Sequence, residues 1–557
     1  ANTTASNNTA VGQNSLSANT TGASNAAVGK DSLKLNTTGA SNVAVGNVAL
    51  DANTSGSQNT ALGDAALGST TTSDCNTAVG ANALFKNTTG TNNTAMGVDA
   101  ALCNTTGDGN TAVGQNSLRL NTTADNNTAV GIQSLDANTE GHSNTAVGKG
   151  SLGANTTADN NVAVGFNALT DNTTGSANTA VGQTALATNT TGADNVAVGK
   201  GALTANTTGA ENIAVGSGVL TANTAGANNI GVGDRALLAN TTGDCTVAIG
   251  YKALAANTTA DFNIGIGACS SLANTTGTAN VAMGAFSLFT STTGDNNVAI
   301  GHDALFCNNG SSADCNTAVG FKAMCKNTTG TNNVGIGISA MQENTTGADN
   351  AAVGRRSLIA NTTGLRNVAV GSLALDANTT GDDHTAVGMD ALGDMTTGGC
   401  NTGLGRYAGS EITTGSNNSA IGFNAQASAV DATNEVTLGD GNINNLRCND
   451  TSISGLSDER DKKNIEDIPH GLEYILALRP VKFDWNTRDG TRVGKKDYGF
   501  IAQELDQVEE TFGNKEYTKL VHKENPNKWE ADVMKTYPIL IKAIQELKAE
   551  IDELKKK

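Results

Sequence analysis

A glycine recurs every 17 residues through most of this chain of 557 residues. It closes a triplet that usually reads Ala-Val-Gly, and the period runs from Gly12 to Gly301 without interruption. After a two-residue insertion it resumes at Gly320, continues to Gly422 and ends in a degenerate copy at Gly439. A fixed period of this kind predicts a solenoid or a fibre, in which each unit contacts only its neighbours. It argues against an enzyme built around one central pocket.

Each unit combines two short apolar segments with a polar turn, as residues 182–198 illustrate. Asn-Thr-Ala-Val is an extended segment, Ala-Leu is the second apolar segment, and Asn-Thr-Thr-Gly suits a turn because Asn and Gly tolerate left-handed backbone. We therefore expect two short strands per coil. The fold class that follows for residues 1–423 is an all-β rod, a parallel β-roll or solenoid of about 25 turns.

The apolar content of a coil bears on the oligomeric state. Each coil offers mainly Val, Leu and two small Ala or Ser side chains, which is little apolar area against the entropy of ordering 17 residues. The column of small alanines predicts close backbone approach at an axis shared with other chains. The sequence therefore favours a homotrimeric rod over a single-chain solenoid.

Charge and composition narrow the classes of partner. The chain has a formal charge of −18, and the segment from Ser457 onward holds 19 basic and 21 acidic residues, so most of the excess negative charge precedes it. An acidic rod repels nucleic acid, because phosphate binding needs clustered Lys and Arg. No apolar run of about 18 residues is present, so no membrane insertion is expected. The sequence starts part-way through a repeat, and we expect an upstream attachment protein or segment.

The repeat also resembles a known one. Asn-Thr-Ala-Val-Gly-x-x-Ala-Leu is similar to the head repeats of YadA-like trimeric adhesins, over roughly residues 1–423. The resemblance implies a left-handed parallel β-roll. The longer coil with Asn-Thr-Thr-Gly is a departure, and it bears on the cross-section of the roll.

The nine cysteines show neither Cys-x-x-Cys nor a spacing with histidine that suits a metal, so no metal site and no cofactor are expected. Four of them occupy one repeat column and are interpreted as point replacements: Cys75, Cys245, Cys315 and Cys400. Cys307 and Cys315 bracket the two-residue insertion, and a disulfide between them would clamp the longer loop in an oxidising setting.

Phenylalanines gather in adjacent coils beside the insertion: Phe286, Phe289, Phe306 and Phe321. Phe289 and Phe306 share one column. Two readings stay open at this point. The rings form either a lateral binding patch for a glycan or a partner, or a local stacking ladder that fills space around the inserted loop.

The C-terminal part departs from the repeat after a transition segment at residues 424–456. Four motifs follow in order: Ser-Asp-Glu-Arg-Asp-Lys-Lys-Asn-Ile at 457–465, Ala-Leu-Arg-Pro-Val-Lys-Phe at 477–483, Gly-Phe-Ile-Ala-Gln-Glu-Leu at 499–505 and Tyr-Pro-Ile-Leu at 537–540. They resemble the intramolecular chaperone domain of phage tail fibres and tailspikes, an auto-processing peptidase family. For residues 457–557 the resemblance implies a small α+β chaperone domain that trimerises the fibre and then cuts itself off.

The resemblance maps the nucleophile to Ser457 and the general base to Lys462, with cleavage between Leu456 and Ser457. A serine needs such a base, and a lysine supplies one if burial or neighbouring cations keep it neutral. Arg460 and Lys463 would lower the pKa of Lys462, whereas the neighbouring carboxylates would raise it. The acidic residue at position 461 replaces the apolar one that the family pattern leads us to expect.

The tail carries an independent sign of trimerisation. Five apolar residues are spaced by four, three, four and three positions, the a/d pattern of a coiled coil: Leu540, Ile544, Leu547, Ile551 and Leu554. The run is short for a coil that is stable by itself. The alternative is a helix that docks on its own domain.

The function that the sequence favours is a trimeric structural fibre on a virion surface, exposed outside the cell and contacting a host receptor or glycan. Any enzymatic activity would be a single self-cleavage by the serine–lysine pair, with no external substrate. The alternative is a bacterial YadA-like surface adhesin or another extracellular filament. A glycan-degrading tailspike is disfavoured, because glycosidases need two carboxylates in one cleft.

Overall fold

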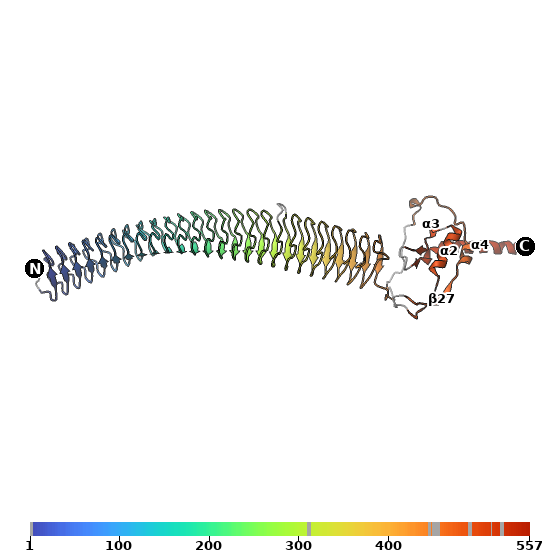
Figure 1. Ribbon diagram of the computed structural model, residues 1–557, viewed down its shortest axis with the longest axis horizontal. Helices are drawn as coiled ribbons and strands as arrows, with labels where there is room; N and C mark the ends of the chain where they lie inside the picture. Colours follow the sequence, from blue (N-terminus) through green and yellow to red (C-terminus); the bar gives the residue numbers. More distant parts are fainter. Residues whose placement is uncertain are drawn as a thin grey trace. The chain divides into compact units, whose positions relative to one another are not determined.

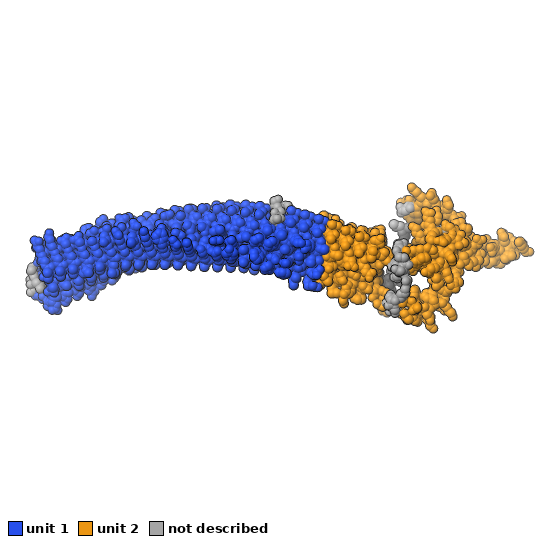
Figure 2. All heavy atoms as spheres, in the orientation of Figure 1, with its two compact units in different colours: residues 1–363 blue, residues 364–557 orange. Residues whose placement is uncertain are grey.

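The computed structural model describes residues 4–308, 313–443, 447, 457–487, 493–513, 515–523 and 529–557. The chain divides into two compact units, residues 1–363 and residues 364–557 (Figure 2). Each unit is considered by itself.

Unit 1 is a parallel β-solenoid in which every coil contributes one strand of three residues (Figure 1). Consecutive strands pair in register at one coil per step, so that Ala163 lies opposite Ala180. The strands are β1 (Thr9–Val11), β2 (Ala26–Val28), β3 (Val43–Val45), β4 (Thr60–Leu62), β5 (Thr77–Val79), β6 (Thr94–Met96), β7 (Thr111–Val113), β8 (Thr128–Val130), β9 (Thr145–Val147), β10 (Val162–Val164), β11 (Thr179–Val181), β12 (Val196–Val198), β13 (Ile213–Val215), β14 (Ile230–Val232), β15 (Val247–Ile249), β16 (Ile264–Ile266), β17 (Val281–Met283), β18 (Val298–Ile300), β19 (Thr317–Val319), β20 (Val334–Ile336) and β21 (Ala351–Val353). The predicted repeat rod is confirmed.

The prediction of two strands per coil is wrong, and the backbone of the leucine segment explains why. In the coil that begins at Gly182, Thr184 and Leu186 have φ angles of 55° and 50°. Two left-handed residues so close together turn the chain and prevent a second strand. The segment still bonds to the next coil, because the Leu186 N–H donates to the Ala202 carbonyl at 2.9 Å.

The core of each coil is made of alanine and leucine. Ala180, Ala185 and Leu186 are fully buried, whereas Val181, the third residue of its strand, points outward and is 36% exposed. The expectation that the alanines lie on an axis shared with other chains is therefore wrong. The interior of one narrow coil requires them, because a larger side chain on the inner face of the strand has no room.

Two columns of buried asparagines hold the coils together. In the first, Asn36 Nδ2 donates to Asn19 Oδ1 of the preceding coil at 2.8 Å and to the Gly39 carbonyl at 3.0 Å. In the second, the Asn25 backbone N–H donates to Asn8 Oδ1 at 2.8 Å, and Asn25 Nδ2 donates to the same Gly39 carbonyl at 2.9 Å. The asparagine of Asn-Thr-Thr-Gly is thus an interior hydrogen-bonding residue as well as a turn residue.

Unit 2 begins with the same kind of coil. Its solenoid strands are β22 (Val368–Val370), β23 (Thr385–Val387), β24 (Thr402–Leu404), β25 (Ser419–Ile421) and β26 (Val436–Leu438), all parallel. The last strand lies within the segment that the sequence assigned to the transition, because Gly439 still closes a coil.

The C-terminal part of unit 2 is a small α+β domain, as predicted. Its elements are η1 (Glu459–Asp461), α1 (Leu472–Ala477), β27 (Val481–Asp484), β28 (Lys496–Gly499), α2 (Ala502–Phe512), α3 (Lys515–Thr518), β29 (Val521–His522), β30 (Glu530–Ala531), η2 (Val533–Thr536) and α4 (Tyr537–Lys556). β27 pairs with β28, and β29 with β30, in antiparallel fashion. Tyr474, Leu520 and Ile539 form its buried core.

Helix α4 fits the alternative that the sequence left open, a helix that docks on its own domain. Its first turns pack on α1, where Ile539 and Ala543 are buried and Glu546 accepts a hydrogen bond from the Leu472 backbone at 2.7 Å. The predicted a/d residues are all exposed in this single chain, from 39% at Leu540 to 70% at Leu554. The helix docks on its own domain and still presents an apolar row.

Candidate functional site

Ser457 and Lys462 lie within hydrogen-bonding distance, and a single helical turn brings them together. The Asp458 carboxylate caps η1 by accepting from the Arg460 backbone N–H at 2.9 Å, and the Lys462 N–H closes the turn on the Glu459 carbonyl at 3.1 Å. Lys462 Nζ then reaches Ser457 Oγ at 2.7 Å. Both residues are exposed. A serine next to an amine has the composition of a nucleophile–base pair.

The charges around this pair are partly neutralised. Arg460 forms a forked ion pair with Asp458, with Nη2–Oδ2 at 2.5 Å and Nε–Oδ1 at 2.9 Å. This contact lowers the pKa of Asp458, because the guanidinium stabilises the carboxylate. Arg460 therefore adds less positive field at Lys462 than the sequence alone suggested. Leu456, on the other side of the predicted cleavage point, and the side chain of the acidic residue at 461 lie outside the described residues.

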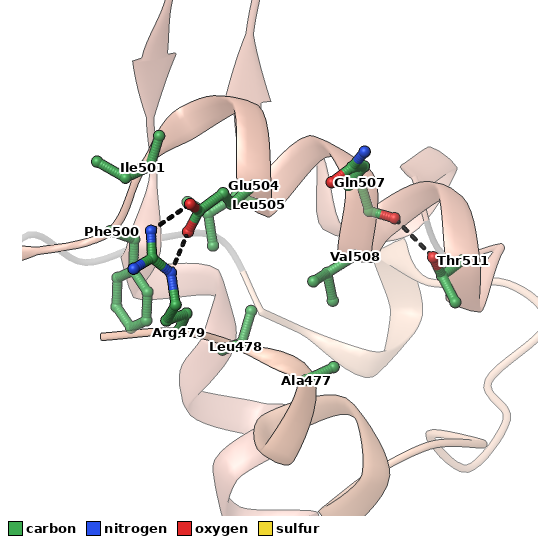
Figure 3. Close-up of a pocket in the computed structure, with 10 residues that line it drawn as sticks. All are labelled: Ala477, Leu478, Arg479, Phe500, Ile501, Glu504, Leu505, Gln507, Val508 and Thr511. Carbon is green, nitrogen blue, oxygen red and sulfur yellow. Dashed lines mark hydrogen bonds and ion pairs between the residues drawn. The ribbon is translucent and has the colours of Figure 1, made fainter. Parts of the chain in front are cut away.

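The same domain has a pocket of about 520 Å³ between the end of α1 and helix α2. Figure 3 shows Arg479 at its edge, with the guanidinium turned onto the carboxylate of Glu504. Arg479 Nε lies 2.9 Å from Glu504 Oε2, and the pair lowers the pKa of Glu504. Leu505 and Val508 supply apolar surface beside it. This ion pair joins two of the four C-terminal motifs.

The structure brings the four predicted phenylalanines of unit 1 into one cluster. Phe289 and Phe306 stack with ring centroids 5.0 Å apart, and Phe286 meets Phe289 edge to face at 5.6 Å. Phe321 joins the group through His302, which lies 5.7 Å from Phe286 and 5.9 Å from Phe321. The shared column of Phe289 and Phe306 is confirmed.

A cavity of about 420 Å³ opens beside these rings. Four of its lining residues were not singled out from the sequence: His302, Asp303, Lys322 and Cys325. The sequence contained a signal for these four residues. They occupy the first, second and fifth positions after Gly301 and Gly320, in the same coils as the phenylalanine rings.

Cys307 and Cys315 are free thiols in the structure and do not form the predicted disulfide. The backbone of each residue pairs with a neighbouring coil. The Cys307 N–H donates to the Cys325 carbonyl at 2.9 Å, and the Cys315 N–H donates to the Asp295 carbonyl at 3.1 Å. The loop between them includes residues 309–312, which lie outside the described part.

Among the described residues, no three His, Cys, Asp or Glu side chains are grouped in a way that would hold a metal ion. In the same ranges, none of the helices combines the length and apolar character that a membrane crossing needs.

Residues 457–514 match the family model described as chaperone of endosialidase, a peptidase family. The comparisons with curated proteins and with solved structures found no match. The matched segment begins at Ser457 and includes Lys462, Arg479 and Glu504, which supports the predicted C-terminal domain. The class that fold and match define is a β-solenoid fibre protein with a C-terminal intramolecular chaperone domain.

Proposed function

We propose that three copies of this chain form a virion fibre that attaches to a host cell, with the C-terminal domain directing its assembly. The observation that carries the proposal is an apolar stripe on the outer face of the sheet. The third residue of each of the 21 strands described in unit 1 is Val, Ile, Leu or Met, and these side chains point away from the core.

The size of this stripe separates a fibre subunit from a monomeric rod. Fourteen of these 21 side chains are exposed, from 36% at Val181 to 57% at Val11, and the other seven are half-buried. Summed over the strands of unit 1, it amounts to an apolar surface on the order of 1,000 Å², which is enough for a specific interface and large for a monomer. Because consecutive strands of the stripe pair in register at one coil per step, an identical stripe on another copy is a matching partner.

Helix α4 supports the same assembly. Its exposed row continues past the point where the helix leaves its own domain, from Leu547 to Leu554. Three such rows packed together would bury these side chains as a short coiled coil. The domain that sets the helix is itself folded around Tyr474, so it can align three chains before the rods pair.

Register explains why a rod of this kind needs a chaperone. A slip by one whole coil replaces each strand by a nearly identical one, so few contacts distinguish the right pairing from a shifted one. Assembly that starts at a distinct C-terminal domain fixes the register before the repeats meet. Virion attachment is the role that suits such a rod, whose acidic, repetitive body offers reach and display.

One variant of the stripe, with three substitutions, and one control variant test the trimer. Val181→Lys, Val198→Lys and Val215→Lys together place charges on three successive strands, whereas Gln183→Lys with Ser217→Lys adds charges on exposed turns outside the stripe. Native mass spectrometry of the full chain should give a trimer for the parent and for the turn variant. The stripe variant should dissociate into monomers at low micromolar concentration. A monomeric parent chain would refute the proposal.

The serine–lysine pair supports the second part of the proposal, cleavage between Leu456 and Ser457. A neutral Lys462 would accept the proton of Ser457 Oγ, which attacks the Leu456 carbonyl carbon. The Ser457 nitrogen takes a proton and leaves, an ester forms, and water hydrolyses it to a Leu456 carboxylate and free Ser457. The event occurs once per chain, on the chain itself.

Cleavage has a direct readout. The parent chain should yield a fragment of residues 457–557 in denaturing mass spectrometry, and Ser457→Ala should abolish it. Lys462→Arg keeps the positive charge but removes the base, because a guanidinium does not deprotonate in proteins. It should therefore abolish the fragment as well. A fragment that persists in both variants would show that the pair does not cut the chain.

A further inference from the structure

The cavity beside the phenylalanine cluster has properties that the fibre and the chaperone leave unexplained. It is formed by turns of three successive coils, and none of its lining residues belongs to a strand. The lining is Phe286, Phe289, His302, Asp303, Phe306, Lys322 and Cys325. The cavity is therefore lined by residues other than the strand residues that make up the outer stripe.

The aromatic wall is fixed before any ligand arrives. Phe289 and Phe306 are stacked with an interplanar angle of 11°, and Phe286 stands at 68° to Phe289. Phe286 has φ at 57°, a backbone conformation that the coil imposes at this column. Phe286 is 36% exposed and Phe321, next to the cavity, 47%. Rings held in this way lose little side-chain entropy on binding.

A small set of polar groups accompanies the rings. His302 Nδ1 lies 3.1 Å from Asp303 Oδ2, so the imidazole and the carboxylate are oriented together. Lys322 Nζ lies 5.3 Å from the Phe321 ring. Burial raises the pKa of Cys325 to about 11, which keeps its thiol neutral. The cavity thus combines apolar ring surface with one carboxylate, one imidazole and one ammonium group.

We infer that this cavity binds a neutral oligosaccharide that contains an N-acetylated hexose. A pyranose ring presents a face of C–H groups that packs on an aromatic surface, and an acetyl methyl group adds apolar contact. Its hydroxyl and amide groups match the Asp303 carboxylate and the His302 imidazole as hydrogen-bonding partners. The lining offers one ammonium group against one carboxylate, so it has no excess of positive charge to hold a sulfated or carboxylated polymer.

This assignment rests on the proposed fibre, because it names the chemical class of surface that the fibre would meet. One cavity of this size would bind a short oligosaccharide weakly. Three copies in one fibre would raise the effective affinity without any new contact, since the second and third binding events are intramolecular.

The test uses the chain of 557 residues and three variants, two of which replace phenylalanine by alanine. Phe289→Ala combined with Phe306→Ala removes the stacked wall of the cavity. Phe85→Ala is the matched control, because Phe85 stands at the same coil position as Phe289 but far from the insertion. Asp303→Asn removes the carboxylate charge and retains the shape of the side chain.

Binding is measured by isothermal titration with a β-1,4-linked N-acetylglucosamine oligomer and, separately, with a sulfated oligosaccharide of similar length. The parent and Phe85→Ala should bind the N-acetylated oligomer equally, and the double variant should bind it about tenfold more weakly or not at all. Asp303→Asn should weaken binding about tenfold or more, as expected for one hydrogen bond to a charged group.

Absence of binding by the parent chain would overturn the inference, as would binding of the sulfated oligosaccharide alone or equal losses in Phe85→Ala and the double variant. Native mass spectrometry on the same samples separates this result from the fibre proposal. A trimer that binds no oligosaccharide refutes the cavity only. A monomer that binds refutes the trimer only.

Discussion

Replacing one buried asparagine by leucine tests how the rod is held together. Asn189 is fully buried and takes part in three hydrogen bonds. Its Nδ2 donates to Asn172 Oδ1 at 2.9 Å and to the Gly192 carbonyl at 2.8 Å, and its Oδ1 accepts from Asn206 Nδ2 at 2.8 Å. Leucine is similar in size, so Asn189→Leu removes these bonds without opening a large cavity.

The loss of these hydrogen bonds affects the three former partners of Asn189 to different degrees. The Gly192 carbonyl keeps the amide of Asn178 at 2.9 Å, and Asn206 Nδ2 keeps the Gly209 carbonyl at 2.9 Å. Asn172 Oδ1 loses its donor inside the coil, which costs about 1–3 kcal/mol, and the other two bonds cost about 1 kcal/mol each. Burial of the leucine side chain stabilises the coil by about 1–2 kcal/mol. We expect a net destabilisation of about 2–3 kcal/mol.

Hydrogen exchange followed by mass spectrometry is the appropriate assay, because coils of a solenoid open locally. The expected loss corresponds to exchange that is roughly a hundredfold faster, confined to peptides from residues 172–206. Coils several repeats away should keep their rates. Global melting alone would average the effect over the whole rod.

The control is Gln183→Leu, which adds the same side chain at an exposed turn position of the same coil. It should change the local free energy of opening by less than about 0.5 kcal/mol. If Asn189→Leu exchanged as slowly as Gln183→Leu, the buried hydrogen-bonded columns would not hold the coils. Faster exchange along the entire rod would refute the local argument.

Three further predictions follow from single positions. Gly182→Ala would place a Cβ 2.4 Å from the Gly199 carbonyl oxygen at a φ of 140°. Hydrogen exchange should show that the free energy of opening of that coil falls by about 3 kcal/mol. For Gly201→Ala, whose Cβ has space, the fall should be about 1 kcal/mol. Burial lowers the pKa of His384, whose Nδ1 accepts a backbone N–H at 3.2 Å. The unfolded chain therefore binds the proton more readily, and the coil should lose stability as pH falls below about 6.5. His384→Asn should remove this pH dependence of hydrogen exchange. Glu509→Ala leaves a buried backbone N–H and a hydroxyl without their acceptor and should destabilise the C-terminal domain by about 2–4 kcal/mol, measured by urea unfolding with tryptophan fluorescence.

In the C-terminal domain, the sequence motifs predicted some contacts and left others undecided. The spacing of Ser457 and Lys462 came from the family pattern, and the structure adds the local cause of their contact, the Asp458-capped turn. The pairing of Arg460 with Asp458 could not be read from the sequence, because either carboxylate beside it was a suitable partner. The same limit applied to α4, whose apolar spacing fitted both docking and a coiled coil.

The sequence by itself determined the architecture of the rod. A strict period leads each coil to repeat the conformation of the last, so the solenoid, the strand at Thr-Ala-Val and the shared column of Phe289 and Phe306 follow from the spacing. Which way each side chain points depended on the turns between the periodic residues. Leu186 at positive φ closes the coil around alanine and leucine, and this leaves Val181 outside. Only the tertiary structure could decide that the valines form the outer stripe and that the asparagines lie in the interior. By residue type alone, valine is expected in a core and asparagine in a turn. In the closed coil, the backbone conformation at the turns determines which side chains point inward.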